Sequence, residues 1–201
     1  MRVSEIAHEL KTHAPFTSFG AVTGIVIMAL FVQFQVPRGV ADTLFWFFHP
    51  LHVLLSALVT TSMYRIHTRS SLWRVVLVGY VGSVGIATLS DSLIPFLGEW
   101  LLDLPNRGVH LGFIEKWWLV NPLAFAGIAL GYFISHTKIA HGGHVLISTW
   151  ASIFHITMAL GTSLDVATAI LIAAFLFLAV WVPCCTSDII FPLLWVKERE
   201  H

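Results

Sequence analysis

Two histidines and an aspartate in the first half of the chain have the spacing of a metal or proton site. His49 and His52 are three residues apart and Ser56 follows, so all three lie on one face of a helix. Asp91, preceded by Ser90, lies near the end of the next apolar stretch, which must run antiparallel to the first. His49, His52 and Asp91 are therefore predicted to meet at one depth. Two imidazoles and a carboxylate are a common ligand set for a divalent transition metal such as zinc, iron or manganese.

The same motifs recur later in the chain, in the same order. Residues 49–56 (HPLHVLLS) match 141–148 (HGGHVLIS), and residues 90–97 (SDSLIPFL) match 187–194 (SDIIFPLL). Two rare polar motifs repeated in order indicate an internal duplication. The second half then offers a second metal site made of His141, His144 and Asp188. Nearby secondary ligands or relay residues are Ser148, Ser187, Cys184 and Cys185.

Two further features of the polar residues leave alternatives open. His155 lies within an apolar stretch and is either a buried neutral histidine bonded across helices or a relay between the two sites. Asp91 precedes Pro95 by one turn, and Asp188 precedes Pro192 in the same way. Each proline removes a backbone hydrogen bond and loosens the helix, which frees carbonyls beside a carboxylate. The alternative is that these aspartates only satisfy the broken helix ends.

The composition indicates that these residues are held by membrane helices. Of the 201 residues, 57% are hydrophobic and only 11% are charged, whereas a soluble domain carries about a quarter charged residues. Six apolar stretches are each about long enough to cross ~30 Å of hydrocarbon. They lie near residues 19–36, 43–64, 72–95, 117–135, 144–160 and 166–195. The sequence thus predicts an all-α polytopic membrane protein with six transmembrane helices.

The distribution of basic residues predicts the orientation of these helices. One set of loops holds Arg2, Lys11, Arg65, Arg69, Arg74, Lys138, Lys197 and Arg199. The other set holds only Arg38, Arg107 and Lys116. Both termini are therefore expected to be cytoplasmic, in the inner (cell) membrane of a prokaryote.

The predicted organisation is a 3+3 inverted-topology repeat. An amphipathic N-terminal segment, 1–18, precedes a first repeat, 19–97. An extracytoplasmic connecting loop, 98–116, leads to a second repeat, 117–195, and a cytoplasmic tail, 196–201. Because each half has an odd number of helices, the second is inverted relative to the first, as in many transporters.

The leading functional hypothesis is a small membrane transporter or channel for a cation, either a divalent metal ion or a proton-coupled solute, that uses the paired His/Asp sites. The alternatives are an intramembrane metal-dependent enzyme acting on a lipid-type substrate, and an accessory subunit of a membrane complex; an enzyme is the less favoured reading. The formal net charge of zero argues against a nucleic-acid partner. The expected partners are membrane lipids, the ion or solute and, through glycine-rich helix faces, a second copy of the chain.

Overall fold

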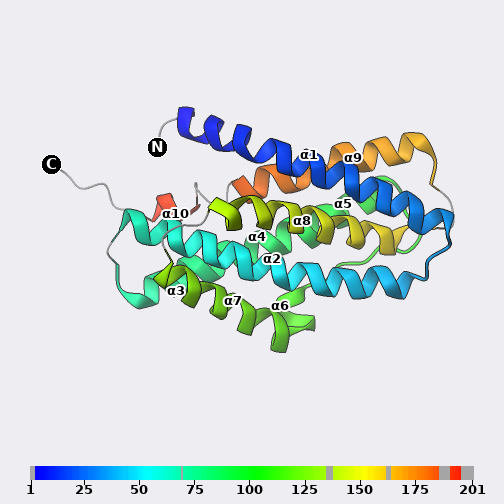
Figure 1. The fold of residues 1–201 in the computed structure, drawn as a ribbon. Coiled ribbons are helices and arrows are strands. Elements are labelled where there is room, and N and C mark those ends of the chain that lie inside the picture. The colour runs from blue at the N-terminus through cyan, green and yellow to red at the C-terminus, as the bar shows by residue number, and fades with distance from the viewer. Residues whose placement is uncertain (1–2, 69, 135–137, 162–163, 186–190, 196–201) are drawn as a thin grey trace.

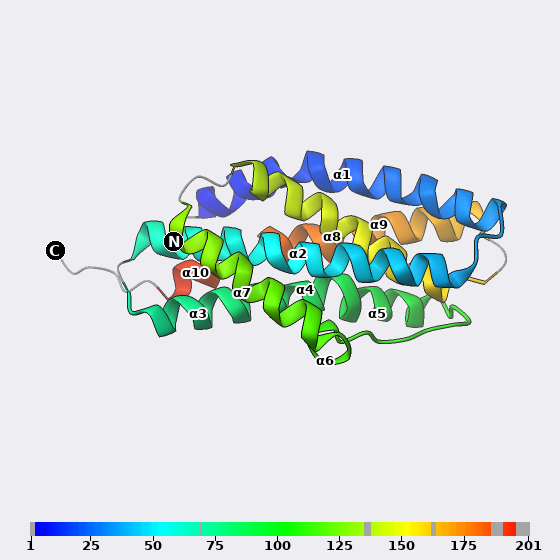
Figure 2. The same ribbon diagram turned by 60° about the horizontal axis from the view of Figure 1, so that its bottom comes forward.

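The computed structural model describes residues 3–68, 70–134, 138–161, 164–185 and 191–195, and its regular elements are helical. The long helices lie side by side along one axis and form an elongated bundle (Figures 1 and 2). They are α1 (Val3–Gln33), α2 (Arg38–His67), a continuous run from Leu72 to Leu101, α7 (Trp117–Phe133), α8 (Lys138–Ala159) and α9 (Val166–Cys185). Two short helices are α6 (Gly112–Glu115) and α10 (Phe191–Leu194). The all-α prediction is confirmed.

Several helices have the length and surface of membrane spans. Within the described residues, four helices are long and apolar enough to cross a membrane: Ala14–Gln33, Arg38–His67, Leu72–Leu101 and Val166–Cys184. Large apolar side chains such as Phe19, Val22 and Leu178 are more than half exposed on them. Helices of this kind suggest an integral membrane protein, in which lipid covers those side chains. The six spans and the inverted repeat stay predictions.

Helices α2 and α8 form the polar centre of the bundle and pack directly against each other. Buried polar side chains recur along one face of each helix at intervals of three or four residues. They are His49, His52, Ser56 and Thr60 on α2, and His144, Ser148, Ser152 and His155 on α8. Because polar groups facing lipid are costly, these faces turn inward. Helices α1 and α9 cover α8, and α7 covers α2.

The third helix, Leu72–Leu101, is interrupted by two π-helical turns. Its parts are α3 (Leu72–Tyr80), η1 (Val81–Gly85), α4 (Ile86–Thr88), η2 (Leu89–Leu93) and α5 (Ile94–Leu101). The turn η2 contains Ser90, Asp91 and Ser92, which are fully buried. Pro95 has no N–H to donate, and the wider π turn before it lets the helix continue. The sequence analysis ended this stretch at Pro95; the helix runs on to Leu101 and includes Glu99.

Helix α1 is continuous from Val3 to Gln33 and includes Pro15, so no break in the helix marks the expected boundary between residues 1–18 and 19–97. It approaches α8 closely through two glycines. A Cβ atom on Gly20 would lie 2.8 Å from Thr149, and one on Gly24 would lie 3.2 Å from Ile153. The absence of side chains at these positions therefore keeps α1 in direct contact with the helix that carries half of the polar centre.

Candidate functional site

The Asp91 carboxylate is the centre of the buried polar cluster. Its Oδ2 atom lies 3.0 Å from His49 Nδ1 and 2.7 Å from His52 Nδ1. All three side chains are essentially inaccessible to solvent. An ionised carboxylate can only accept hydrogen bonds, so with Asp91 ionised both imidazoles carry a proton on Nδ1. The sequence analysis predicted that these three residues meet, and the structure brings them together.

Two serines occupy the other oxygen of the same carboxylate. Ser90 and Ser148 each donate from Oγ to Asp91 Oδ1 at 2.7 Å. Ser148 belongs to α8, in the predicted second repeat, whereas Asp91 belongs to the first. The carboxylate thus has four donors, which offsets the large free-energy cost of removing a negative charge from water. It also ties α2, η2 and α8 together at one point.

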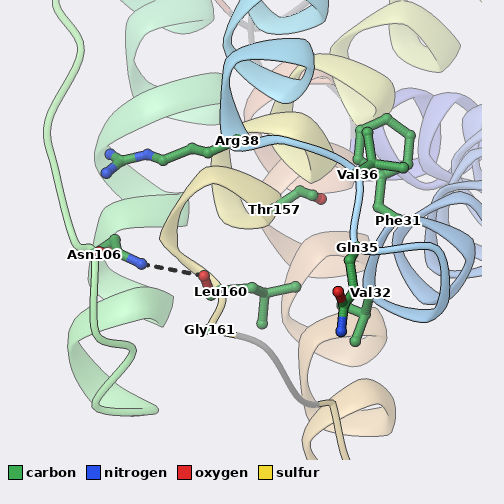
Figure 3. Close-up of a pocket in the computed structure, with 9 residues that line it drawn as sticks. All are labelled: Phe31, Val32, Gln35, Val36, Arg38, Asn106, Thr157, Leu160 and Gly161. Atoms are coloured by element: carbon green, nitrogen blue, oxygen red, sulfur yellow. Dashed lines mark hydrogen bonds between the residues drawn. The ribbon is translucent and has the colours of Figure 1, made fainter.

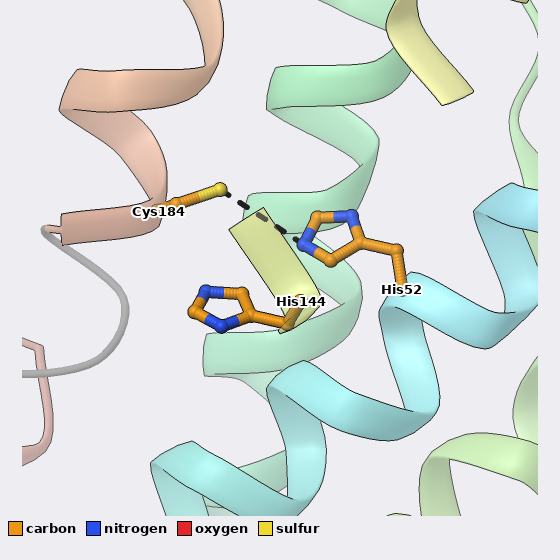
Figure 4. A group of neighbouring side chains, drawn as sticks. All are labelled: His52, His144 and Cys184. Carbon is orange, nitrogen blue, oxygen red and sulfur yellow. Dashed lines mark hydrogen bonds between the residues drawn. The ribbon is translucent and has the colours of Figure 1, made fainter. Parts of the chain in front are cut away.

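Three side chains of types that bind metals lie close together, and one of them, His52, donates to this carboxylate. Figure 4 shows the three side chains. His52, His144 and Cys184 each offer a ligand atom, and these atoms lie within 4.8 Å of one another. All three residues are buried and come from α2, α8 and α9. The rings of His52 and His144 stack with centroids 5.8 Å apart, and Cys184 Sγ lies 3.9 Å from His52 Nε2. Three separate helices therefore direct nitrogen and sulfur donors into one small volume.

The donor types and spacing suit a soft or borderline transition metal. Around a tetrahedral zinc ion, with Zn–N of ~2.0 Å and Zn–S of ~2.3 Å, the ligand atoms are ~3.5 Å apart. In the observed group the corresponding atoms lie within 4.8 Å of one another. Thiolate and imidazole ligands favour zinc, copper(I) and iron, whereas manganese, calcium and magnesium prefer oxygen. The buried His52/His144/Cys184 group could therefore hold a metal ion.

Asp91 has the place of a carboxylate that orients a metal-binding histidine. It accepts from His52 at Nδ1, and the opposite nitrogen of that ring, Nε2, faces Cys184. Metal-binding histidines commonly donate their second N–H to a carboxylate, which fixes the tautomer and raises the basicity of the ligand nitrogen. Asp91 is bonded to His49 and His52 here, and its prediction as a metal ligand itself stays a prediction.

A second buried carboxylate–histidine pair lies closer to the other end of α8. Glu99 Oε1 lies 2.7 Å from His155 Nδ1, and both side chains are 1% exposed. Glu99 Oε2 accepts the backbone N–H of Gly108 at 3.2 Å. The sequence analysis found no partner for His155 because it assigned Glu99 to the connecting loop. The available signal was the position of Glu99 eight residues beyond Asp91, about two helical turns away.

The remaining predicted residues divide into three groups. His144 and Ser148 were expected in a separate inner site, but they lie against His52 and Asp91, so the described residues of both halves form one cluster. Ser56 is buried on the same helix as His52. Ser187 and Asp188 lie outside the described residues, as do the side chains of His141 and Cys185.

One cavity of the bundle lies away from this cluster. A pocket of about 310 Å³ opens between the end of α1, the start of α2 and the end of α8 (Figure 3). Its polar lining includes Gln35, Arg38, Asn106 and Thr157. Asn106 holds the loop onto α8 by donating to the carbonyl of Leu160 at 3.2 Å. His52, His144 and Cys184 do not line this pocket.

The chain matches no model of a known protein family, no curated protein and no solved structure. What the site does must therefore follow from its own geometry and chemistry.

Proposed function

We propose that this chain is a membrane transporter for a transition-metal cation, with a central binding site made of His52, His144 and Cys184. The observation that supports it is the convergence of these three donors, from three helices, on one buried point. A permanent structural metal would serve equally well in a surface loop. Burying polar side chains among membrane helices costs free energy, and such residues therefore usually have a function.

The origin of the ligands favours transport over catalysis. His52 belongs to the predicted first repeat, whereas His144 and Cys184 belong to the second. In transporters built from inverted repeats, the substrate site lies where the two repeats meet, and movement of one repeat against the other exposes it to each side in turn. The six-span inverted repeat is part of this proposal. One shared site replaces the two separate sites that the sequence analysis expected.

The roles of the neighbouring residues follow from the proposed site. Asp91 keeps the proton of His52 on Nδ1, so that Nε2 presents its lone pair to the ion. Ser90 and Ser148 hold the carboxylate in place through Oδ1. The ion would enter dehydrated, since all three donors are buried. Zinc, iron or copper(I) is a more suitable cargo than manganese because one ligand is a thiolate.

The binding step can be tested with Co²⁺, which reports thiolate ligation by a charge-transfer absorption band. We expect purified wild-type protein to show this band at one equivalent of Co²⁺, and Cys184→Ser to lose it. His144→Asn should weaken Co²⁺ binding, whereas His67→Asn, an exposed histidine near the end of α2, should not. Cys185→Ser is the matched cysteine control. A band that survives in Cys184→Ser and disappears in Cys185→Ser would overturn the proposed ligand set.

Transport itself requires a second measurement. Wild-type protein in sealed liposomes should carry Co²⁺ to a trapped metal-sensitive dye, and Cys184→Ser should carry none above the protein-free background. Binding without transport in the wild type would exclude the transporter and leave the enzyme as the next candidate. That candidate is favoured by an apolar groove of about 400 Å³ between η2, α5 and α9, whose lining includes Pro183, the residue before Cys184.

A further inference from the structure

The Glu99–His155 pair plays no part in the proposed metal site, yet its surroundings are those of a proton-binding group. Both side chains are buried, and they bond each other at 2.7 Å. Burying ionisable side chains among membrane helices costs free energy, so a pair of them in this position indicates a function. What distinguishes this pair from an inert buried ion pair is the set of partners around the imidazole.

His155 can be neutral or protonated without losing a hydrogen bond. Its Nδ1 atom donates to Glu99 in either state, and its Nε2 atom lies 3.4 Å from Ser92 Oγ. The Ser92 hydroxyl can donate to Nε2 when the ring is neutral and accept from Nε2–H when the ring is protonated. The same oxygen accepts the backbone N–H of His110 at 3.0 Å. The site is therefore built to hold two protonation states that differ by one proton.

A partly exposed pair connects this site to the surface. His110 Nδ1 lies 3.2 Å from Glu115 Oε2, and their side chains are 22% and 40% exposed. The ring centroid of His110 lies 5.3 Å from that of His155. Glu115 could therefore pass a proton to His110, whose ring lies about one side-chain length from the buried pair. Both residues belong to the segment that connects α5 to α7.

An aromatic ring separates this proton site from the metal site. Phe45 contacts the rings of His110, His155 and His49 at centroid distances of 5.7, 5.3 and 5.3 Å. Since a phenyl ring offers no proton carrier, hydrogen bonds do not pass directly between the sites at this point. The link is the π turn η2: Ser92 bonds to the proton site, and its neighbour Asp91 bonds to the histidines of the metal site.

The titratable groups that face His155 are few. They are Glu99 from α5, His110 from the loop and His49 from α2. Asp91 lies beyond His49, and Glu115 beyond His110. Lys116 Nζ lies 5.6 Å from the centre of the Trp46 ring, and that ring contacts the ring of His110. No described lysine or arginine pairs with Glu99.

We propose that the Glu99–His155 pair binds a proton taken up through Glu115 and His110, and couples proton movement to metal transport through η2. The coupling rests on the proposed transport function, whereas the proton site does not. When His155 gains a proton, its bond to Ser92 reverses direction, and the same turn positions Asp91. Binding of a proton on one side of η2 thus alters the ligand geometry on the other.

Two measurements test this inference separately from the metal site. The first is the ¹⁵N imidazole spectrum of histidine-labelled protein, with the His155 signal assigned by its loss in His155→Asn. We expect the wild-type signal to change protonation state when the sample is titrated with acid, because the partners of the imidazole satisfy both states. In Glu99→Gln the midpoint should move to lower pH by about one unit or more, because the carboxylate that favours the protonated imidazole is gone. An unchanged midpoint, or no protonation change in the wild type, would overturn the proton site.

The second measurement is Co²⁺ uptake into liposomes with and without an imposed pH gradient. Glu99→Gln should keep the Co²⁺ absorption band and lose the response of uptake to the gradient. Asp103→Asn, a carboxylate 89% exposed in the same connecting segment, should keep both. A Glu99→Gln protein that still responds to the gradient refutes the coupling. If wild-type protein neither binds nor transports Co²⁺, the proposed transport function is wrong. The ¹⁵N spectrum then still decides whether Glu99 and His155 bind a proton.

Discussion

Asp91 and Cys184 lie on opposite sides of the His52 ring. The carboxylate oxygen Oδ2 is 2.7 Å from Nδ1, and the sulfur is 3.9 Å from Nε2. A hydrogen bond at one ring nitrogen determines which tautomer is present and leaves the lone pair on the other. The carboxylate in the first predicted repeat thus controls how a histidine on α2 faces a thiol from the second.

Replacing Asp91 by asparagine should weaken metal binding without abolishing it. The amide no longer carries the charge that raises the basicity of His52, and loss of such a partner typically costs about 10–100-fold in affinity. The measurement is Co²⁺ affinity by competition with a chelator. Asp165→Asn is the control, because Asp165 is exposed and only caps α9 through Thr168. Equal affinities in the two variants would show that Asp91 does not act on the site.

Replacing Ser148 by alanine should destabilise the protein more than replacing Ser152. Ser148 donates to the buried Asp91 carboxylate, whereas Ser152 donates to backbone carbonyls on η2 and α8. Hydrogen bonds to charged groups contribute about 1.5–3 kcal/mol, against about 0.5–1.5 kcal/mol for neutral ones. Reversible unfolding in mixed micelles measures both variants on the same helix. A larger loss of unfolding free energy in Ser152→Ala than in Ser148→Ala would contradict a site shared between the two halves.

The meeting of His49, His52 and Asp91 could be predicted from the sequence because it depends on short-range geometry. Residues three apart on a helix share a face, and consecutive membrane helices are antiparallel. The approach of α8 was not predictable in this way. Ser148 and His144 reach the first cluster because the polar faces of α2 and α8 pack together, and spacing along the chain does not specify which helices become neighbours.

The role of Glu99 was missed for a local reason. Proline usually ends a helix, so the apolar stretch was ended at Pro95 and Glu99 was assigned to the connecting loop, 98–116. The π turn η2 absorbs the missing hydrogen bond, and the helix carries Glu99 to His155. A wide turn of this kind leaves no clear pattern in a single sequence, although π turns often occur at functional sites.

Close packing of α7 on α2 should depend on Gly127. A Cβ atom there would lie 2.8 Å from Ala57 Cβ and would also collide with the carbonyl oxygen of Leu54. Gly127→Ala should therefore cost about 1–3 kcal/mol of unfolding free energy, as overpacking does. Gly85→Ala is the matched control, since nothing lies within 4 Å of a Cβ atom at that position. Equal stability of the two variants would show that α7 does not pack as described.

The two ends of the run from Leu72 to Leu101 should lie on opposite sides of the membrane. Its 30 residues span about 45 Å at 1.5 Å per residue, more than the hydrocarbon thickness. Ser71 and Arg107 flank this helix and are exposed. The excess of basic residues near Ser71 predicts that this end is cytoplasmic.

An impermeant maleimide added to intact cells should then label Arg107→Cys, and should label Ser71→Cys only after lysis, with wild-type protein as the background. Neither substitution disturbs the core, because the Arg107–Asp103 ion pair is exposed and such pairs contribute little. The reverse labelling pattern would invert the orientation. Labelling of both positions from one side would show that this helix does not cross the membrane, and the proposal of six spans would fail with it.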